Sequence, residues 1–235
     1  MKWSNKGPKH WVVTGASRGI GLELVTQLLR AQEKVTVIAR GLATNETLQR
    51  LKSDFSTQLH LLQADVTVDD EIERVATALG GQSVDVLVNN AGVLRESAAP
   101  LSEINIQLVT EQLLVNAVAP LRVTRALLPM LLKAERPIVA NITSKMGSIA
   151  DASKGAYGYR MSKAALNMFT KCLAAELSHG ISLSLHPGWV KTEMGGSEAP
   201  VEIPESVSGL LNVIRSAQPE QTGKFFDFRG NTIPW

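Results

Sequence analysis

Short apolar runs alternate with longer amphipathic stretches over most of the chain. The short runs are rich in β-branched residues, and several are almost uninterrupted, as in parallel strands that helices cover on both faces. Predicted strands occupy residues 10–14, 34–39, 58–63, 84–89, 137–143 and 181–186, and a last one covers 224–228. The period of the longer stretches predicts helices over 20–30, 44–54, 68–80, 120–134 and 159–179, with a further helical stretch over 101–118.

This alternation predicts an α/β fold built from right-handed βαβ units. We expect a doubly wound Rossmann-type sandwich of three layers, with a mostly parallel sheet of about seven strands. No long linker or low-complexity segment divides the sequence, so we predict a single Rossmann-type domain over residues 1–235. The least regular stretch, residues 195–204, is rich in glycine and proline and is a candidate mobile loop.

The composition and charge of the chain argue against some classes of function. The 235 residues are 44% hydrophobic, which is enough for one sizeable core, and a net charge of +2 is too small to attract nucleic acid or an anionic membrane. The start of the sequence lacks the apolar run of a signal peptide, and no uninterrupted apolar stretch is long enough to span a bilayer. We therefore expect a cytoplasmic protein without nucleic-acid or membrane partners. The single cysteine, Cys172, lies in an apolar helical stretch, where we expect it to be buried.

A glycine-rich turn follows the first predicted strand. It reads T-G-A-S-R-G-I-G over residues 14–21 and opens the first predicted helix. Glycines allow a sharp turn there and let backbone N–H groups approach a pyrophosphate at the positive end of the helix. The turn is therefore predicted to bind a dinucleotide cofactor through Gly15, Ser17, Arg18, Gly19, Ile20 and Gly21.

The end of the second predicted strand bears on the choice between NAD and NADP. An NAD site places a carboxylate there, about 20 residues beyond the turn, to bind the ribose hydroxyl. This chain reads V-I-A-R-G over residues 37–41 and has no acid at that place. Arg40, together with Arg18 in the glycine turn, can form charge-assisted bonds to a 2′-phosphate. The sequence therefore predicts NADP(H); the alternative is that both arginines are ordinary surface residues.

Two more strand ends point to the same crevice. Asp65 and Val66 follow the third predicted strand, where the Asp65 carboxylate either accepts a bond from the adenine amine or caps the next helix. The fourth strand runs into N-N-A-G over residues 89–92, whose small residues let the backbone pass under the adenosine ribose. We expect Asn90, Ala91 and Gly92 to contact the cofactor, and an asparagine side chain there to tie strands together.

Tyr159 and Lys163 form the candidate pair for proton transfer. Their i, i+4 spacing puts both side chains on one face of a helix. A free phenol has a pKa of about 10, and a nearby ammonium favours the phenolate, so Lys163 is expected to lower the pKa of Tyr159. The pair can then act as a general acid–base catalyst at a carbonyl or alcohol. Tyr157 is a rival phenol, but the residue at its i+4 position is Met161, which carries no charge.

Two polar residues accompany this pair. Ser144 follows the fifth predicted strand, at the carboxyl end where ligands bind in such sheets, and can donate to an oxygen that gains negative charge. Asn116 lies in an otherwise apolar helical stretch, and a buried asparagine needs partners. We expect Asn116 either to bend that helix or to hold a water linked to Lys163.

Taken in order, these motifs resemble the short-chain dehydrogenase/reductase family over about residues 10–195. In that family an Asn-Ser-Tyr-Lys tetrad carries the catalysis, and the resemblance implies this role for Asn116, Ser144, Tyr159 and Lys163. It also implies that Tyr159 and Lys163 contact the cofactor, Lys163 through the nicotinamide ribose hydroxyls. The resemblance further assigns to the nicotinamide end residues 142–144, Pro187, Gly188, Val190 and Thr192.

Within the family, segments 159–167 and 185–196 and the closing I-P-W look like the sniffer-like and C-factor-like carbonyl reductases. The interval from Ser144 to Tyr159 is longer than is common in the wider family. We expect that loop to line the substrate side, so general family substrates do not carry over. The resemblance implies an NADP(H)-dependent oxidoreductase acting on a small carbonyl or alcohol, without a metal, in a homodimer or homotetramer.

Two alternatives stay open on the sequence. An epimerase or dehydratase uses the same Tyr and Lys with a retained cofactor, but such relatives usually carry a larger substrate domain than the residues after Gly195 provide. A nucleotide-sensing regulator or developmental signalling protein uses the fold as a binding module, and the C-factor-like resemblance is the reason to keep this alternative.

Overall fold

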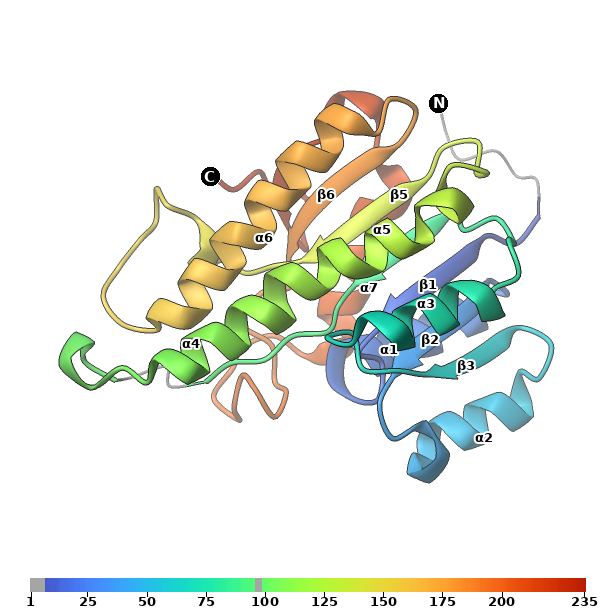
Figure 1. The fold of residues 1–235 in the computed structure, drawn as a ribbon, viewed down its shortest axis with the longest axis horizontal. Helices are drawn as coiled ribbons and strands as arrows, with labels where there is room; N and C mark the ends of the chain where they lie inside the picture. The colour runs from blue at the N-terminus through green and yellow to red at the C-terminus, as the bar shows by residue number, and fades with distance from the viewer. Residues whose placement is uncertain (1–6, 96–98) are drawn as a thin grey trace.

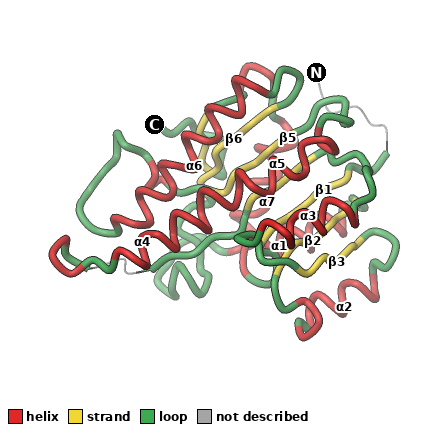
Figure 2. The backbone as a smooth tube through the Cα atoms, in the orientation of Figure 1, coloured by secondary structure: helices red, strands yellow, loops and turns green. Residues whose placement is uncertain are grey.

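Seven strands form a single sheet in the computed structural model, which describes residues 7–95 and 99–235 (Figures 1 and 2). Their order is β3-β2-β1-β4-β5-β6-β7, and every neighbouring pair is parallel. The predicted doubly wound Rossmann-type fold is confirmed. The strands are β1 His10–Thr14, β2 Lys34–Ala39, β3 Leu59–Gln63, β4 Val86–Asn89, β5 Ile138–Ile142, β6 Ile181–His186 and β7 Lys224–Asp227.

Helices cover both faces of the sheet (Figure 1). One face packs against α1 Gly19–Arg30, α2 Glu46–Asp54 and α7 Ile203–Ser216. The other face packs against α3 Asp69–Ala78, α5 Ala119–Leu131 and α6 Tyr157–Glu176, and α4 Ile106–Leu113 runs into α5. Short 3₁₀ turns cover Leu42–Thr44, Leu101–Glu103, Lys145–Gly147 and Pro219–Gln221.

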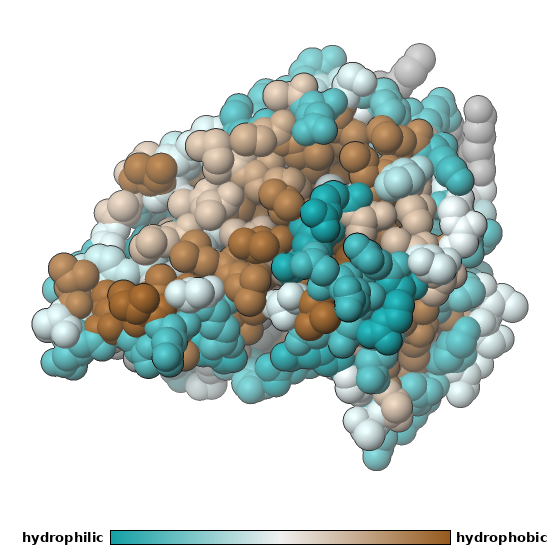
Figure 3. Space-filling model, viewed as in Figure 1, coloured by the Kyte–Doolittle hydropathy of each residue, from teal (hydrophilic) through white to brown (hydrophobic). Residues whose placement is uncertain are grey.

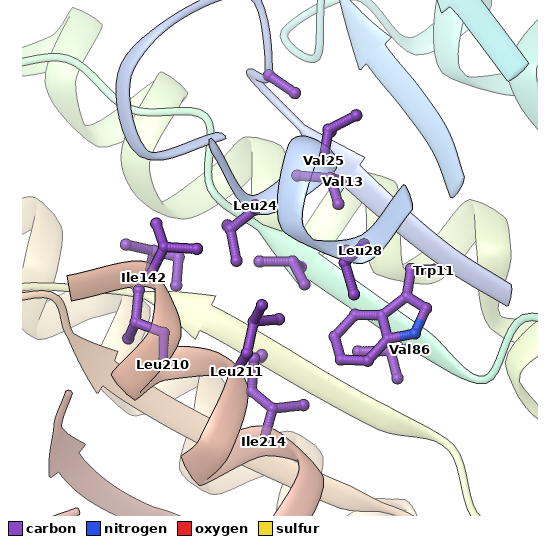
Figure 4. Packing of buried hydrophobic residues seen from close by; sticks show 14 of the residues in the cluster. Trp11, Val13, Leu24, Val25, Leu28, Val86, Ile142, Leu210, Leu211 and Ile214 are labelled. Carbon is purple, nitrogen blue, oxygen red and sulfur yellow. The ribbon is translucent and has the colours of Figure 1, made fainter. Parts of the chain in front are cut away.

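The face beneath α1 and α7 holds the larger apolar core (Figure 4). Leu24 and Leu28 of α1 meet Leu210 and Ile214 of α7 over the sheet, and all four side chains are fully buried. Burying a side chain of this size contributes about 1.5–3 kcal/mol. This packing fixes α1 against β1 and thereby fixes the glycine turn between them.

The two predicted helical stretches on either side of residue 119 join into one continuous helix from residue 106 to 131. Between α4 and α5 the chain makes a π-helical segment, Leu114–Val118, which carries Asn116. Pro120 follows directly on the π-helical segment, where the α-helical bonding pattern is already interrupted. By length and composition Ile106–Leu131 could cross a membrane; in this structure the helix packs on α6, and 39% of its most apolar window is buried.

Three sequence expectations change or stay open. Cys172 is exposed on α6, so the prediction that it is buried was wrong: it lies on the helix side that faces away from the sheet. The predicted loop 195–204 ends early, because α7 begins at Ile203. The prediction of one domain over residues 1–235 includes residues 1–6, which lie outside the described residues, and it stays a prediction.

Candidate active site

A crevice of about 1190 Å³ opens at the carboxyl ends of the strands, where the sheet order reverses between β1 and β4. Ligands of doubly wound sheets bind at this point. The structure brings eighteen of the predicted site residues to its lining: Gly15, Ser17, Arg18, Gly19, Ile20, Gly21, Arg40, Asp65, Val66, Asn90, Ala91, Gly92, Ile142, Thr143, Tyr159, Lys163, Pro187 and Thr192.

The glycine turn is packed too closely for side chains. A Cβ on Gly15 would lie 2.6 Å from the Ala91 Cα, and one on Gly21 would lie 2.5 Å from the Asn90 Nδ2. Gly15 also has a φ of +68°, a backbone conformation that other residues rarely adopt. The turn is held by Thr14, whose Oγ1 accepts bonds from the backbone N–H groups of Asn90 and Ala91 at 3.0 and 3.1 Å.

The start of α1 is suited to an anion. Arg18 is the N-cap residue, it has an extended backbone, and its side chain makes no capping bond to the first turn. No acidic residue lies in that turn. The positive end of the helix dipole therefore meets no compensating carboxylate from the helix itself.

Both arginines predicted to bind a 2′-phosphate are paired with carboxylates. The Arg40 Nη1 lies 3.4 Å from the Asp65 Oδ2, and the Arg18 guanidinium contacts the Glu193 carboxylate. Asp65 also accepts bonds from the Thr67 N–H and hydroxyl at 2.9 and 2.7 Å, and these bonds with the Arg40 charge outweigh its burial and lower its pKa. The N-cap of α3 is Val68, so Asp65 shapes the turn ahead of the helix instead of capping it.

Tyr159 and Lys163 lie together on α6, deep at the base of the crevice. The Lys163 Nζ is 5.6 Å from the centre of the Tyr159 ring and donates to the Ile142 carbonyl at 2.9 Å. Burial raises the pKa of Tyr159 to about 12, against the opposing effect of a hydrogen bond with Ser144. Burial also lowers the pKa of Lys163 to about 8. The expected lowering of the phenol pKa is therefore not found, because desolvation of Tyr159 outweighs its neighbours.

Asn116 is fully buried, and both polar atoms of its side chain form hydrogen bonds. Its Oδ1 accepts from the Val93 N–H at 2.8 Å, and its Nδ2 donates to the Val93 carbonyl at 2.8 Å and to the Ser162 Oγ at 3.0 Å. The Ser162 hydroxyl donates in turn to the Tyr159 carbonyl at 2.8 Å. The sequence analysis missed Ser162, although its place between Tyr159 and Lys163 was visible in the motif.

Gly92 lies beside two residues of the tetrad. A Cβ on Gly92 would lie 3.2 Å from the Asn116 Oδ1 and 3.5 Å from the Lys163 Nζ, so a side chain at this position would crowd both polar groups. Of the two roles expected for Asn116, the π segment fits a change of helix geometry, and the water linked to Lys163 stays a prediction.

Some predicted residues lie outside the crevice lining. Ser144 and Asn116 are buried and are not part of the lining, and Val190 is buried in an isolated bridge with Val201. Gly188 adopts a φ of +88° against Phe228. The loop from 145 to 158 contributes no residue to the lining of this crevice, and the expectation that it lines the substrate side stays a prediction. Lining residues that the site prediction left out include Leu94, Arg95, Glu111, Leu114 and Val115, which belong to loops and helix faces without a motif.

The chain is similar to known proteins over most of its length. The family model described as short chain dehydrogenase matches residues 9–202. The chain belongs to the short-chain dehydrogenase family. Short-chain dehydrogenases are oxidoreductases, and the motifs in the sequence resemblance lie in the matched stretch.

Among curated proteins, this short-chain dehydrogenase is 46% identical over 155 residues to the C-signal of Myxococcus xanthus, covering 65% of the chain and 93% of that protein. It is 31% identical to the short-chain dehydrogenase RED3 of Pyricularia oryzae, covering 95% of the chain and 97% of that protein.

Two solved structures have the same fold along nearly the whole chain. An NADPH-bound carbonyl reductase from chicken fatty liver has a TM-score of 0.89 at 33% identity, covering 97% of this short-chain dehydrogenase and 100% of that chain. The carbonyl reductase Sniffer of D. melanogaster has a TM-score of 0.90 at 30% identity, with the same coverage. The predicted likeness to sniffer-like and C-factor-like proteins is confirmed.

Proposed function

We propose that the protein is an NADP(H)-dependent carbonyl reductase. The observation that carries the proposal is the position of Tyr159 and Lys163 at the base of a crevice that also holds two arginines, Arg18 and Arg40. The similarity to an NADPH-bound carbonyl reductase supports the same conclusion.

The residues present fit a dinucleotide phosphate. The close-packed glycine turn and the uncapped start of α1 suit a pyrophosphate, and Arg18 and Arg40 suit a 2′-phosphate. In this proposal Lys163 binds the nicotinamide ribose, and Pro187 and Thr192 hold the nicotinamide end. Gly188 and Val190 act behind them by shaping the backbone.

The proposed chemistry is a carbonyl reduction. NADPH, when bound, supplies a hydride to the carbonyl carbon. The Ser144 hydroxyl donates to the carbonyl oxygen as negative charge develops there, and Tyr159 gives that oxygen its proton. Lys163 stabilises the resulting phenolate by its charge. Asn116 holds the geometry around Gly92 through which a water returns a proton to Lys163 and Tyr159.

The pKa of Tyr159 favours this direction. With a pKa raised to about 12 by burial, the phenol holds its proton throughout the neutral range, and the phenolate that forms after proton transfer needs the charge of the nearby Lys163 ammonium. Alcohol oxidation needs the phenolate at the start and is therefore expected to be slower at neutral pH.

A panel of ketones, aldehydes and quinones tests the activity, with NADPH consumption followed by absorbance. NADPH is expected to give a higher kcat/KM than NADH. Arg40→Asp should lower kcat/KM for NADPH by about 10- to 100-fold, since it removes a charged hydrogen bond, and should leave NADH nearly unchanged. An enzyme that prefers NADH, or an Arg40→Asp variant with unchanged preference, contradicts the choice of cofactor.

The likeness to C-signal favours a second candidate, a signalling role that uses the fold to bind a nucleotide. Stoichiometric NADPH oxidation with a carbonyl supports the enzyme, whereas binding without turnover supports the signalling role. The Tyr159 phenol beside Lys163 favours catalysis, because nucleotide binding alone does not require a group that can give a proton to a carbonyl oxygen.

We further propose that two copies of the chain associate through α5 and α6. Apolar side chains gather over these helices on the face shown in Figure 3. The exposed members are Leu114, Val118, Leu121, Tyr157, Met161 and Met168. Contiguous apolar surface of this kind marks interfaces, and a self-complementary face of two helices suits a two-fold dimer.

A further inference from the structure

Glu193 holds Arg18 at the mouth of the crevice. Arg18 belongs to the glycine turn before α1, whereas Glu193 belongs to the segment that follows β6, and both side chains line the crevice. Their charged groups form an ion pair across 175 positions of sequence. The two segments are neighbours in the backbone as well, since a Cβ on Gly19 would lie 3.6 Å from the Thr192 Cγ2.

The segment that carries Glu193 is braced by its own bonds. The Trp189 Nε1 donates to the Gly195 carbonyl at 2.7 Å, the Lys191 N–H to the Val201 carbonyl at 2.9 Å, and the Gly195 N–H to the Thr192 Oγ1 at 3.0 Å. Because none of these bonds involves the Glu193 carboxylate, removing that charge should leave the segment folded in place.

The two carboxylates that pair with the crevice arginines differ in their other interactions. The Asp65 carboxylate accepts hydrogen bonds from Thr67 as well as pairing with Arg40, so it also stabilises a turn. Among the described residues, the Glu193 carboxylate has Arg18 as its one ion-pair partner. The Arg18 and Glu193 side chains are 75% and 72% exposed, and such pairs are weak and easily exchanged.

We propose that Glu193 is a specificity-determining residue that competes with the 2′-phosphate of the cofactor for Arg18. This inference rests on the proposed function, in which Arg18 binds that phosphate. A bound 2′-phosphate and the Glu193 carboxylate cannot both take the same guanidinium face, so the phosphate has to displace the carboxylate. Glu193 therefore lowers the affinity of the protein for NADPH. It leaves the affinity for NADH less affected, because NADH has no 2′-phosphate, and so it reduces the preference for NADPH over NADH.

The test is a titration of NADPH and NADH into the purified protein, followed by cofactor fluorescence. Glu193→Gln is expected to lower the Kd for NADPH by about two- to fivefold, the range that corresponds to an exposed ion pair, with a smaller change for NADH. In an Arg18→Met background the same substitution should have no effect on the NADPH Kd. Glu198→Gln is the matched control, because it removes the same charge from an exposed site on the same segment.

Each other outcome overturns the inference. An unchanged or raised NADPH Kd in Glu193→Gln shows that the carboxylate does not compete for Arg18. An equal gain in Glu198→Gln or in the Arg18→Met background shows a general charge effect. Failure of the proposed function is seen separately, in the wild-type protein, as NADPH binding without carbonyl turnover or as a preference for NADH.

Discussion

Burial sets the charge states of the two central residues. The spacing of Tyr159 and Lys163 predicts a shared helix face, and the structure places them on that face. Spacing does not give depth, however, and depth reverses the expected effect on the phenol. The pKa of Tyr159 is raised to about 12 and that of Lys163 is lowered to about 8, in both cases chiefly by burial.

Lys163→Met should abolish carbonyl reduction and raise the melting temperature at pH 7. Below pH 8 the folded and unfolded states both carry the proton, and the folded state bears the full cost of a buried ammonium. Between pH 8 and 10.5 the unfolded lysine binds more protons, so the unfolding free energy of the wild type rises with pH.

Thermal melts of the wild type and of Lys163→Met from pH 7 to pH 10 check the direction of this pH dependence. The advantage of Lys163→Met is expected to shrink as pH rises through that window. A variant that melts below the wild type at pH 7 would show that the Lys163 bond to the Ile142 carbonyl outweighs the desolvation of its charge.

At the scale of elements, the loop from β5 to α6 is held from two sides. Arg160 of α6 donates to the Gly155 carbonyl at 3.2 Å and to the Met146 carbonyl at 3.4 Å. From the other side, the Pro234 carbonyl accepts the Ser148 hydroxyl at 2.7 Å, and the Trp235 carbonyl accepts the Ala150 N–H at 2.8 Å. These contacts fix a long loop that carries Ser144 near its start.

Arg160→Ala should lower kcat/KM for a carbonyl substrate by about tenfold and leave the Kd for NADPH unchanged. Loss of the bond to the Met146 carbonyl loosens the turn in which the Ser144 Oγ accepts the Met146 N–H, so Ser144 is placed less accurately. Steady-state kinetics and cofactor titration separate the two effects. An equal loss of NADPH affinity would mean that Arg160 supports the whole crevice.

At the scale of the molecule, the sequence predicted the layered α/β architecture better than the details of single helices and loops. Buried apolar strands and a glycine turn are local patterns, so the parallel sheet and the crevice at its reversal followed from them. The exposure of Cys172 and the join of α4 with α5 are local features of single helices that the sequence interpretation got wrong. The ion pair of Arg18 with Glu193 joins distant segments, and no local pattern encodes that contact.

The apolar face over α5 and α6 gives a prediction about assembly. Met161 and Met168, which are 52% and 64% exposed, should lie in the interface of the proposed dimer. Replacing both with Glu should convert the dimer to a monomer, because paired carboxylates would be buried without partners. Sedimentation analysis is the measurement, and Val68→Glu, at an exposed apolar residue before α3, is the control. A wild-type monomer would contradict the proposed dimer.

The central claim, that Tyr159 delivers the proton in an NADPH-dependent carbonyl reduction, is tested most directly by Tyr159→Phe. The measurement is NADPH oxidation with a carbonyl that the wild type reduces, alongside the Kd for NADPH of both proteins. The account predicts that Tyr159→Phe binds NADPH as the wild type does and loses nearly all turnover, since a general acid contributes about 100- to 10,000-fold. Carbonyl reduction by Tyr159→Phe at the wild-type rate would contradict it.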